Sequence, residues 1–185
     1  MEKQKGFTLM ELLIVIGVLG ILAAGLLAAI DPFEQLKKAR DANNRNASIE
    51  LMNAFTRYYA THGEFPWNLD TPVYCNGVDA SDDPGSISGG AVEAQSISAC
   101  VAALENDGEL KDDFLDNIST DLYIASESDT NIRVCFAPEG KASRTDSLTK
   151  WILTGAGPYT ITEDDAGDTC PDPTGEAVNC LQCFQ

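Results

Sequence analysis

The first 62 residues contain two different patterns of hydrophobic and polar positions. From Phe7 to Ile30 the run is apolar apart from one charge, Glu11. At 1.5 Å per residue, a helix of that length measures about 36 Å, enough to cross a bilayer. Past Pro32, apolar residues recur every three or four positions among charged ones, as in an amphipathic helix. We therefore expect one helix from Phe7 to about His62, kinked by Pro32 near Asp31.

The amphipathic half should place its apolar stripe against the rest of the chain. That stripe consists of Leu36, Ala39, Ala47, Leu51, Phe55, Tyr58 and Tyr59. Charged residues, Asp41 and Arg45 among them, fill much of the remaining surface. Gly63 and Pro66 end the helix, because glycine suits a helix C-terminus and proline cannot continue the helix.

The remaining residues predict short elements after a Gly/Ser/Asp/Pro-rich loop over residues 68–90. We expect a helix from Ala91 to Asn106, strands at Leu122–Ala125, Ile132–Ala137, Trp151–Thr154 and Tyr159–Thr162, and a terminal loop from Glu163 to Gln185. Alternation places Ile132, Val134 and Phe136 on the face toward the long helix, and Arg133 and Cys135 on the other. The predicted fold class is α+β, with a long N-terminal helix packed on a small antiparallel sheet.

Glu11 is the anomaly of the apolar run. A carboxylate at the centre of a membrane helix costs about 2.5–3.5 kcal/mol on insertion scales. We therefore expect that Glu11 meets a cation in apolar surroundings, and that this cation comes from outside its own helix face.

These N-terminal residues resemble the class III signal of type IV prepilins and type II secretion pseudopilins. The resemblance rests on Lys3 and Lys5, on Gly6, on Phe7-Thr8-Leu9-Met10-Glu11 and on the apolar run that follows. Tyr58-Tyr59 with Gly63-Glu64-Phe65-Pro66 resembles the end of the long helix in the same family. The resemblance implies that a prepilin peptidase cuts between Gly6 and Phe7 and methylates the new terminus. It also implies that Glu11 pairs with the terminal nitrogen of Phe7 in a neighbouring subunit.

The resemblance implies four parts: a leader (1–6), a membrane and filament-core helix (7–30), an amphipathic stem helix (31–62) and a globular head (63–185). The precursor would be a single-pass inner-membrane protein with an exported head. It would later join a surface pilus or a periplasmic pseudopilus. Its partners would be membrane lipid, the peptidase, an inner-membrane assembly platform, and copies of itself and other pilins. Counting the positive charges that flank the run would favour the opposite orientation, and Ala23-Ala24-Gly25 would suit an ordinary signal peptide.

The six cysteines all lie in the part predicted to be exported: Cys75, Cys100, Cys135, Cys170, Cys180 and Cys183. An even number in an exported domain predicts disulfides, and six cysteines allow fifteen connectivities. Cys180-Leu181-Gln182-Cys183 would also suit a redox pair or half a zinc site. Disulfides are favoured because the chain has a single histidine, His62, and no second such pair.

Charge and composition limit the possible chemistry. The chain carries a net charge of −17, which disfavours direct binding to nucleic acid. One histidine gives no catalytic constellation, so an enzyme is not expected and no cofactor is predicted. Asp164, Asp165 and Asp168 form an acidic loop that would suit calcium but lacks EF-hand spacing. Asn46-Ala47-Ser48 and Asn117-Ile118-Ser119 match the glycosylation pattern.

The expected function is that of a structural filament subunit in adhesion, motility, DNA uptake or secretion. The alternative is a membrane-anchored binding module, such as a calcium-dependent adhesin, that does not polymerise. Glu11 distinguishes the two, because a monomeric anchor has no use for that charge.

Overall fold

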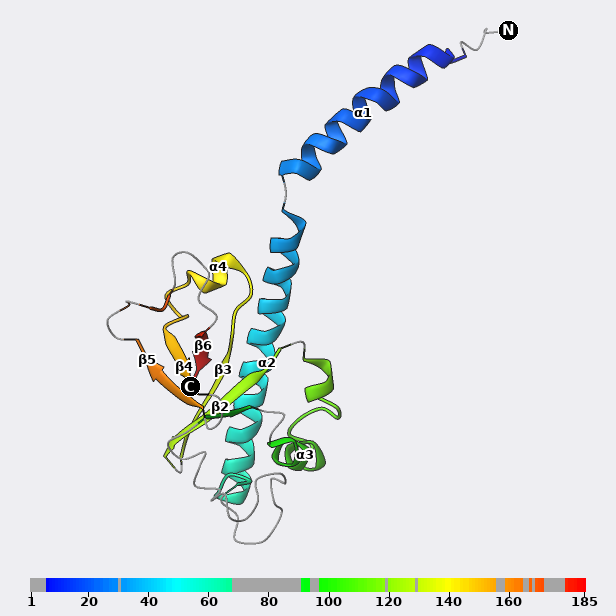
Figure 1. The fold of residues 1–185 in the computed structure, drawn as a ribbon. Helices are drawn as coiled ribbons and strands as arrows, with labels where there is room; N and C mark the ends of the chain where they lie inside the picture. The colour runs from blue at the N-terminus through cyan, green and yellow to red at the C-terminus, as the bar shows by residue number, and fades with distance from the viewer. Residues whose placement is uncertain are drawn as a thin grey trace. The chain divides into compact units, whose positions relative to one another are not determined.

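The structure is a computed structural model. It describes residues 6–29, 31–67, 91–93, 97–118, 120–128, 130–155, 159–164, 167, 169–171 and 179–185. The chain divides into two compact units, with the boundary between Leu36 and Lys37. Figure 1 shows the elements of both.

The N-terminal helical region consists of two helices, α1 (Leu9–Ala29) and α2 (Pro32–His62). Asp31 caps the start of α2, since its Oδ1 accepts the N–H of Phe33 at 3.0 Å and that of Glu34 at 3.4 Å. Pro32 occupies the first helical position, where an N–H would have no acceptor within the helix, so proline costs no hydrogen bond there. The prediction of one kinked helix was therefore wrong: α1 ends at Ala29, and a second helix, α2, begins at Pro32. The predicted end is confirmed, because Gly63 follows α2 with φ +81°.

The second unit contains a six-stranded antiparallel sheet with the order β1-β2-β3-β6-β4-β5. Its strands are β1 (Ala91–Glu93), β2 (Leu122–Ser128), β3 (Asn131–Phe136), β4 (Trp151–Thr154), β5 (Thr160–Glu163) and β6 (Cys180–Phe184). Among the described residues, the short helical segments between strands are α3 (Ser98–Asn106), η3 (Leu115–Asn117) and α4 (Lys141–Arg144). The α+β class is confirmed.

Two expectations about these elements were wrong. The helix predicted from Ala91 begins only at Ser98, and Ala91–Glu93 pairs instead with Tyr123–Ala125 of β2. The tail predicted to be a loop ends in β6, which lies between β3 and β4. Pairing on both edges satisfies the backbone groups of β6, and Leu181 is fully buried there. The sequence did not indicate this short strand, because the residues that precede it are mostly polar and predict a loop.

The main core lies between α2, the sheet and α3, and Figure 1 shows α2 with the sheet on one side and α3 on the other. The predicted alternation of β3 is confirmed. Ile132, Val134 and Phe136 belong to this core, whereas Cys135 packs with Trp151 and Leu181 on the opposite face. Buried Arg133 lies on that opposite face as well, with its guanidinium 3.7 Å from the centre of the Trp151 ring.

The buried face of α2 differs from the expected stripe in its first half. Leu36 and Ala39 are exposed. The buried positions from there onward are Asp41, Asn44, Ser48, Leu51, Ala54, Phe55 and Tyr58. The spacing of three and four is as expected. Its first three residues are polar, and Asp41, expected among the surface charges, is only 4% exposed.

Candidate functional site

The segment before α1 has the geometry of a helix capping box. Thr8 donates its N–H and its hydroxyl to Glu11 Oε2, at 3.0 and 2.9 Å, and Glu11 donates its N–H to Thr8 Oγ1 at 3.2 Å. This is the reciprocal Thr-x-x-Glu arrangement, and it satisfies donors that a helix start leaves open. Thr8-Leu9-Met10-Glu11 carries the sequence signal for this box. Glu11 therefore has a local hydrogen-bond partner, Thr8, and the external cation stays a prediction.

The predicted processing site lies just outside this box. Gly6 and Phe7 precede α1 in exposed, non-helical backbone, and the Phe7 side chain is 83% exposed. A cut between them would leave Thr8 and its amide in place, because that amide belongs to the Phe7–Thr8 bond. The capping box would therefore survive in the shortened chain.

Helix α1 exposes apolar side chains along Leu9–Leu27. Residues Leu9–Leu27 have a mean hydropathy of 2.5 and none of this segment is buried. Within the described residues, α1 is the one helix long and apolar enough to cross a bilayer. Such a surface is stable only in lipid or against other apolar surfaces. The single carboxylate in α1, that of Glu11, lies in its first turn.

At the N-terminal end of the head, Asp41 joins α2 to the loop that follows β3. Its Oδ1 accepts the N–H of Glu139 at 2.8 Å, and its Oδ2 accepts the N–H of Gly140 at 2.9 Å. A Cβ at position 140 would lie 2.9 Å from Asp41 Oδ2, so the close approach requires glycine. On the surface beside this contact, Arg40 forms an ion pair with Glu139 at 3.2 Å.

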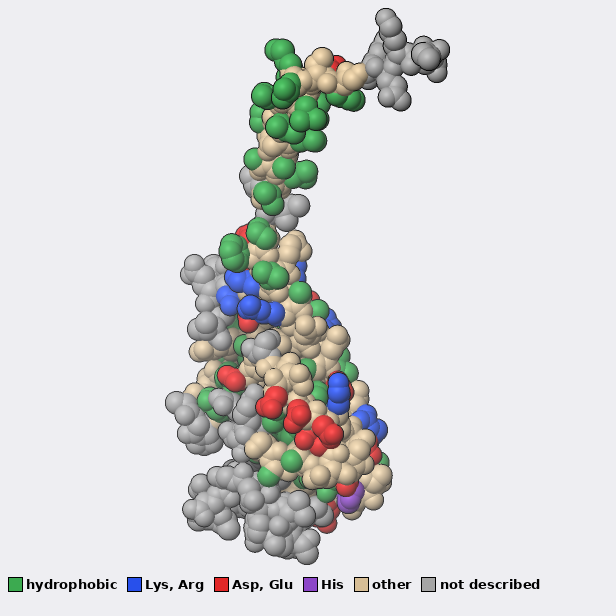
Figure 2. Space-filling view, turned by 90° about the vertical axis from the view of Figure 1, so that its right-hand side faces the viewer, with side chains coloured by type: hydrophobic (Ala, Val, Ile, Leu, Met, Phe, Trp, Pro, Cys, Tyr) green, Lys and Arg blue, Asp and Glu red, His purple; other side chains and the backbone are tan. Residues whose placement is uncertain are grey.

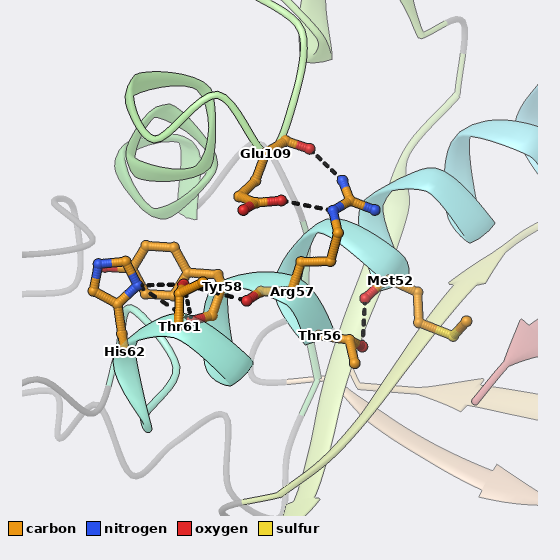
Figure 3. A network of polar contacts seen from close by, with 7 residues as sticks. All are labelled: Met52, Thr56, Arg57, Tyr58, Thr61, His62 and Glu109. Carbon is orange, nitrogen blue, oxygen red and sulfur yellow. Dashed lines mark hydrogen bonds and ion pairs between the residues drawn. The ribbon is translucent and has the colours of Figure 1, made fainter.

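At the other end of α2, a polar network ties the stem to the segment after α3 (Figure 3). Arg57 donates from Nε to Glu109 Oε2 at 2.6 Å and from a terminal nitrogen to the Glu109 carbonyl. His62 stacks on Tyr58 at 4.0 Å between ring centres, and its Nε2 lies 3.3 Å from Asp107 Oδ2. Burial raises the pKa of Tyr58 above its usual value, and the carboxylate of Asp107 adds to the effect.

Disulfides hold the C-terminal strand. Cys135 of β3 is bonded to Cys183, which lies directly opposite in β6, and Cys170 is bonded to Cys180 at the start of β6. Cys180 and Cys183 are therefore not partners of each other, which excludes the redox-pair and zinc readings of that spacing in this structure. Cys100 is also disulfide-bonded, and Cys75 lies outside the described residues.

The acidic loop after β5 uses one of its carboxylates internally. Asp164 accepts backbone N–H groups from Gly167, Thr169 and Cys170 at 3.1, 2.7 and 2.8 Å. Its two oxygens thus hold the loop that leads to Cys170. The other calcium candidates, Asp165 and Asp168, lie outside the described residues.

The acceptor residues of the two glycosylation motifs, Asn46 and Asn117, are both exposed. Ser48 of the first motif is fully buried, and its hydroxyl donates to the Asn44 carbonyl within α2. Asn117 is exposed at the end of η3, and Ser119 lies outside the described residues.

Comparison with known proteins agrees with this arrangement. The family described as "Prokaryotic N-terminal methylation motif" matches residues 1–27. A fimbrial protein of Neisseria meningitidis serogroup B is 43% identical over 65 residues, which are 35% of this chain and 37% of that protein. A serogroup A fimbrial protein is 38% identical over 76 residues, 41% of this chain and 44% of that one. Those two alignments cover less than half of the relatives' length.

A longer alignment covers nearly the whole chain. A type IV major pilin protein, PilE1, of Neisseria gonorrhoeae is 27% identical over 184 residues, 98% of this chain and 75% of that protein. No solved structure matches.

The exposed apolar helix and the helix packed on a sheet thus occur in a chain whose N-terminus matches the prokaryotic methylation motif. Over nearly its whole length the chain is similar to a Neisseria major pilin, and its first 27 residues match the methylation-motif family. The printed names of these relatives, fimbrial protein and major pilin, agree with the expectation of a structural protein.

Proposed function

We propose that the chain is a subunit of a type IV pilus-like filament, cut between Gly6 and Phe7, N-methylated at Phe7, and assembled through α1. The precursor stays in the inner membrane with its head exported. The mature chain then moves, through the assembly platform, into a surface pilus or a periplasmic pseudopilus. The observation that carries this proposal is the single carboxylate, Glu11, in the first turn of an otherwise apolar and wholly exposed helix.

In this proposal, Glu11 pairs with the terminal ammonium of Phe7 in a neighbouring subunit. The capping box supports this role, because Thr8 binds Oε2 and so orients the carboxylate at the helix start. Water is excluded when α1 helices pack together, so an ammonium buried there without a counter-charge is strongly penalised. The pair sets the register while the apolar residues supply adhesion.

The capping box also offers a competing role for Glu11, which is to stabilise the helix start and nothing more. Glu11→Gln separates the two roles. Glutamine completes a capping box as glutamate does, but it carries no charge. Thr8→Val is the matched variant, because it removes the capping hydroxyl and keeps the charge.

The experiment compares both variants with the wild type in cells that lack another copy of the chain. Intact mass first establishes that each protein begins at Phe7 and carries the methyl group. Electron microscopy and immunoblotting of sheared surface material then measure filaments. We expect that Glu11→Gln is processed but yields no filaments, whereas Thr8→Val retains a large part of the wild-type yield.

Normal filaments from Glu11→Gln would refute the pairing and favour the capping role. A wild-type protein that begins at Ala24 or later would refute the processing step. A correctly processed wild type that yields no filaments in surface or periplasmic fractions would favour the membrane-anchored binding module.

A further inference from the structure

The exposed charges of the second unit, Lys37–Gln185, are separated along α2. The basic segment, residues 37–45, contains Lys37, Lys38, Arg40 and Arg45, and its one acid, Asp41, is buried. The acidic segment, residues 105–121, contains seven carboxylates and one cation, Lys111. Figure 2 shows Lys and Arg gathered near the start of α2 and Asp and Glu farther along the same face.

Part of the acidic segment is used inside the molecule. Glu109 bonds to Arg57, Asp107 faces His62, and Glu105 accepts the N–H of Phe114 at 3.0 Å. The remaining carboxylates are those of Asp112, Asp113, Asp116 and Asp121, and all four residues are exposed. Among the described residues, no ion pair or hydrogen bond uses these carboxylates.

The basic segment likewise presents charge outward. Arg40 is engaged by Glu139, but its side chain is still 57% exposed. Lys38 is exposed and, within the described part of the chain, forms no ion pair. The guanidinium of Arg45 lies 5.5 Å from the centre of the Phe184 ring, a contact that leaves its charge uncompensated.

We propose that the acidic segment of one subunit docks on the basic segment of a second copy of this chain in the filament. The inference rests on the filament function proposed above and adds a second contact to it. Charge complementarity identifies the occupant. Copies packed side by side through α1 without displacement would place basic beside basic and acidic beside acidic, whereas a displacement along the helix brings opposite charges together.

The size of that displacement follows from α2. The acidic segment is attached to α2 at Arg57, through Glu109. Arg57 is 12 residues beyond Arg45 and 19 beyond Lys38, which corresponds to about 18–29 Å of helix.

The test is a charge swap in the full chain, expressed in cells without another copy. One variant reverses the basic side with Lys38→Glu and Arg45→Glu. A second reverses the acidic side with Asp112→Lys and Asp116→Lys. A third carries all four changes, so that every subunit has both surfaces reversed. Glu64→Lys, a reversal at an exposed acid next to the end of α2, serves as the matched control.

Sheared filament yield is measured relative to processed protein in the membrane. We expect that each one-sided variant loses about tenfold or more, since two contacts change from attraction to repulsion. The filament yield of the variant with all four substitutions should recover to within about threefold of the wild type. The yield of Glu64→Lys should match the wild type.

The outcomes distinguish the two proposals. If the wild type forms no filament, the proposed function fails. If the wild type forms filaments and the one-sided variants do so equally well, the docking inference alone is wrong. A four-fold variant that is processed but no better than either one-sided variant also overturns it. If the basic-side variant does not accumulate, Lys38→Gln with Arg45→Gln replaces it and should give a smaller loss of filament yield. A yield equal to that of the wild type would then overturn the inference.

Discussion

Replacing Asp41 by alanine should destabilise the protein far more than the replacement of a surface charge, which the sequence predicts Asp41 to be. The carboxylate accepts two backbone N–H groups, from Glu139 and Gly140, and is 4% exposed. A hydrogen bond to a charged group contributes about 1.5–3 kcal/mol, and a buried donor left unpaired costs about 1–3 kcal/mol. Because the bond to Glu139 is only partly buried, we expect a total loss of about 3–4 kcal/mol.

Urea denaturation of the detergent-solubilised full chain, followed by near-ultraviolet circular dichroism, measures this loss. Arg40→Ala is the matched control, because Arg40 reaches the same loop from the neighbouring position through an exposed pair with Glu139. It should cost about 1 kcal/mol or less. Asp41→Asn should be intermediate, since the amide retains one acceptor. The reasoning is refuted if Asp41→Ala lowers the free energy of unfolding no more than Arg40→Ala does.

Three further results are expected. Replacing both cysteines of the Cys135–Cys183 bond by serine should lower the free energy of unfolding by about 4 kcal/mol. The same change at the Cys170–Cys180 bond should lower it by about 3 kcal/mol, because the sequence separations are 48 and 10. Equal urea midpoints for the two double-serine variants would contradict this. Leu181→Ala, at a fully buried site of β6, should cost about 2–5 kcal/mol in the same assay, and a loss under 1 kcal/mol would show that the site is not packed as described. Tyr58 has a raised pKa, so its contribution to stability is complete below its unfolded value near 10 and is lost as pH rises toward the raised folded value; between pH 9 and 11 the melting temperature of the wild type should fall more than that of Tyr58→Phe.

Periodicity and turn chemistry predicted the helices and most strands from sequence because they act locally. The end of α2 at Gly63, the core face of β3 and the strand at Trp151–Thr154 all depended on such local signals. Strand β6 was missed for a different reason. Its pairing with β3 and β4 is set by tertiary contacts that no window of the sequence contains.

The same limit applies to the candidate site. Gly6, Phe7 and Glu11 were found because they form one short motif. The role of Asp41 was not predictable, since its partners lie about a hundred residues away and are backbone amides, which every residue has. The capping role of Glu11 was predictable, because Thr8 stands three residues before it.

The position of β6 has a consequence for how the protein can be made and handled. Strand β6 closes the sheet, so before it is in place β1-β2-β3 and β4-β5 are separate pieces, with the edges of β3 and β4 open. Open strand edges invite pairing with other chains, so the period before the C-terminus arrives is the time of greatest aggregation risk. A truncation of only a few residues at this end would make that condition permanent. An affinity tag fused directly after Gln185 would extend a central strand of the sheet.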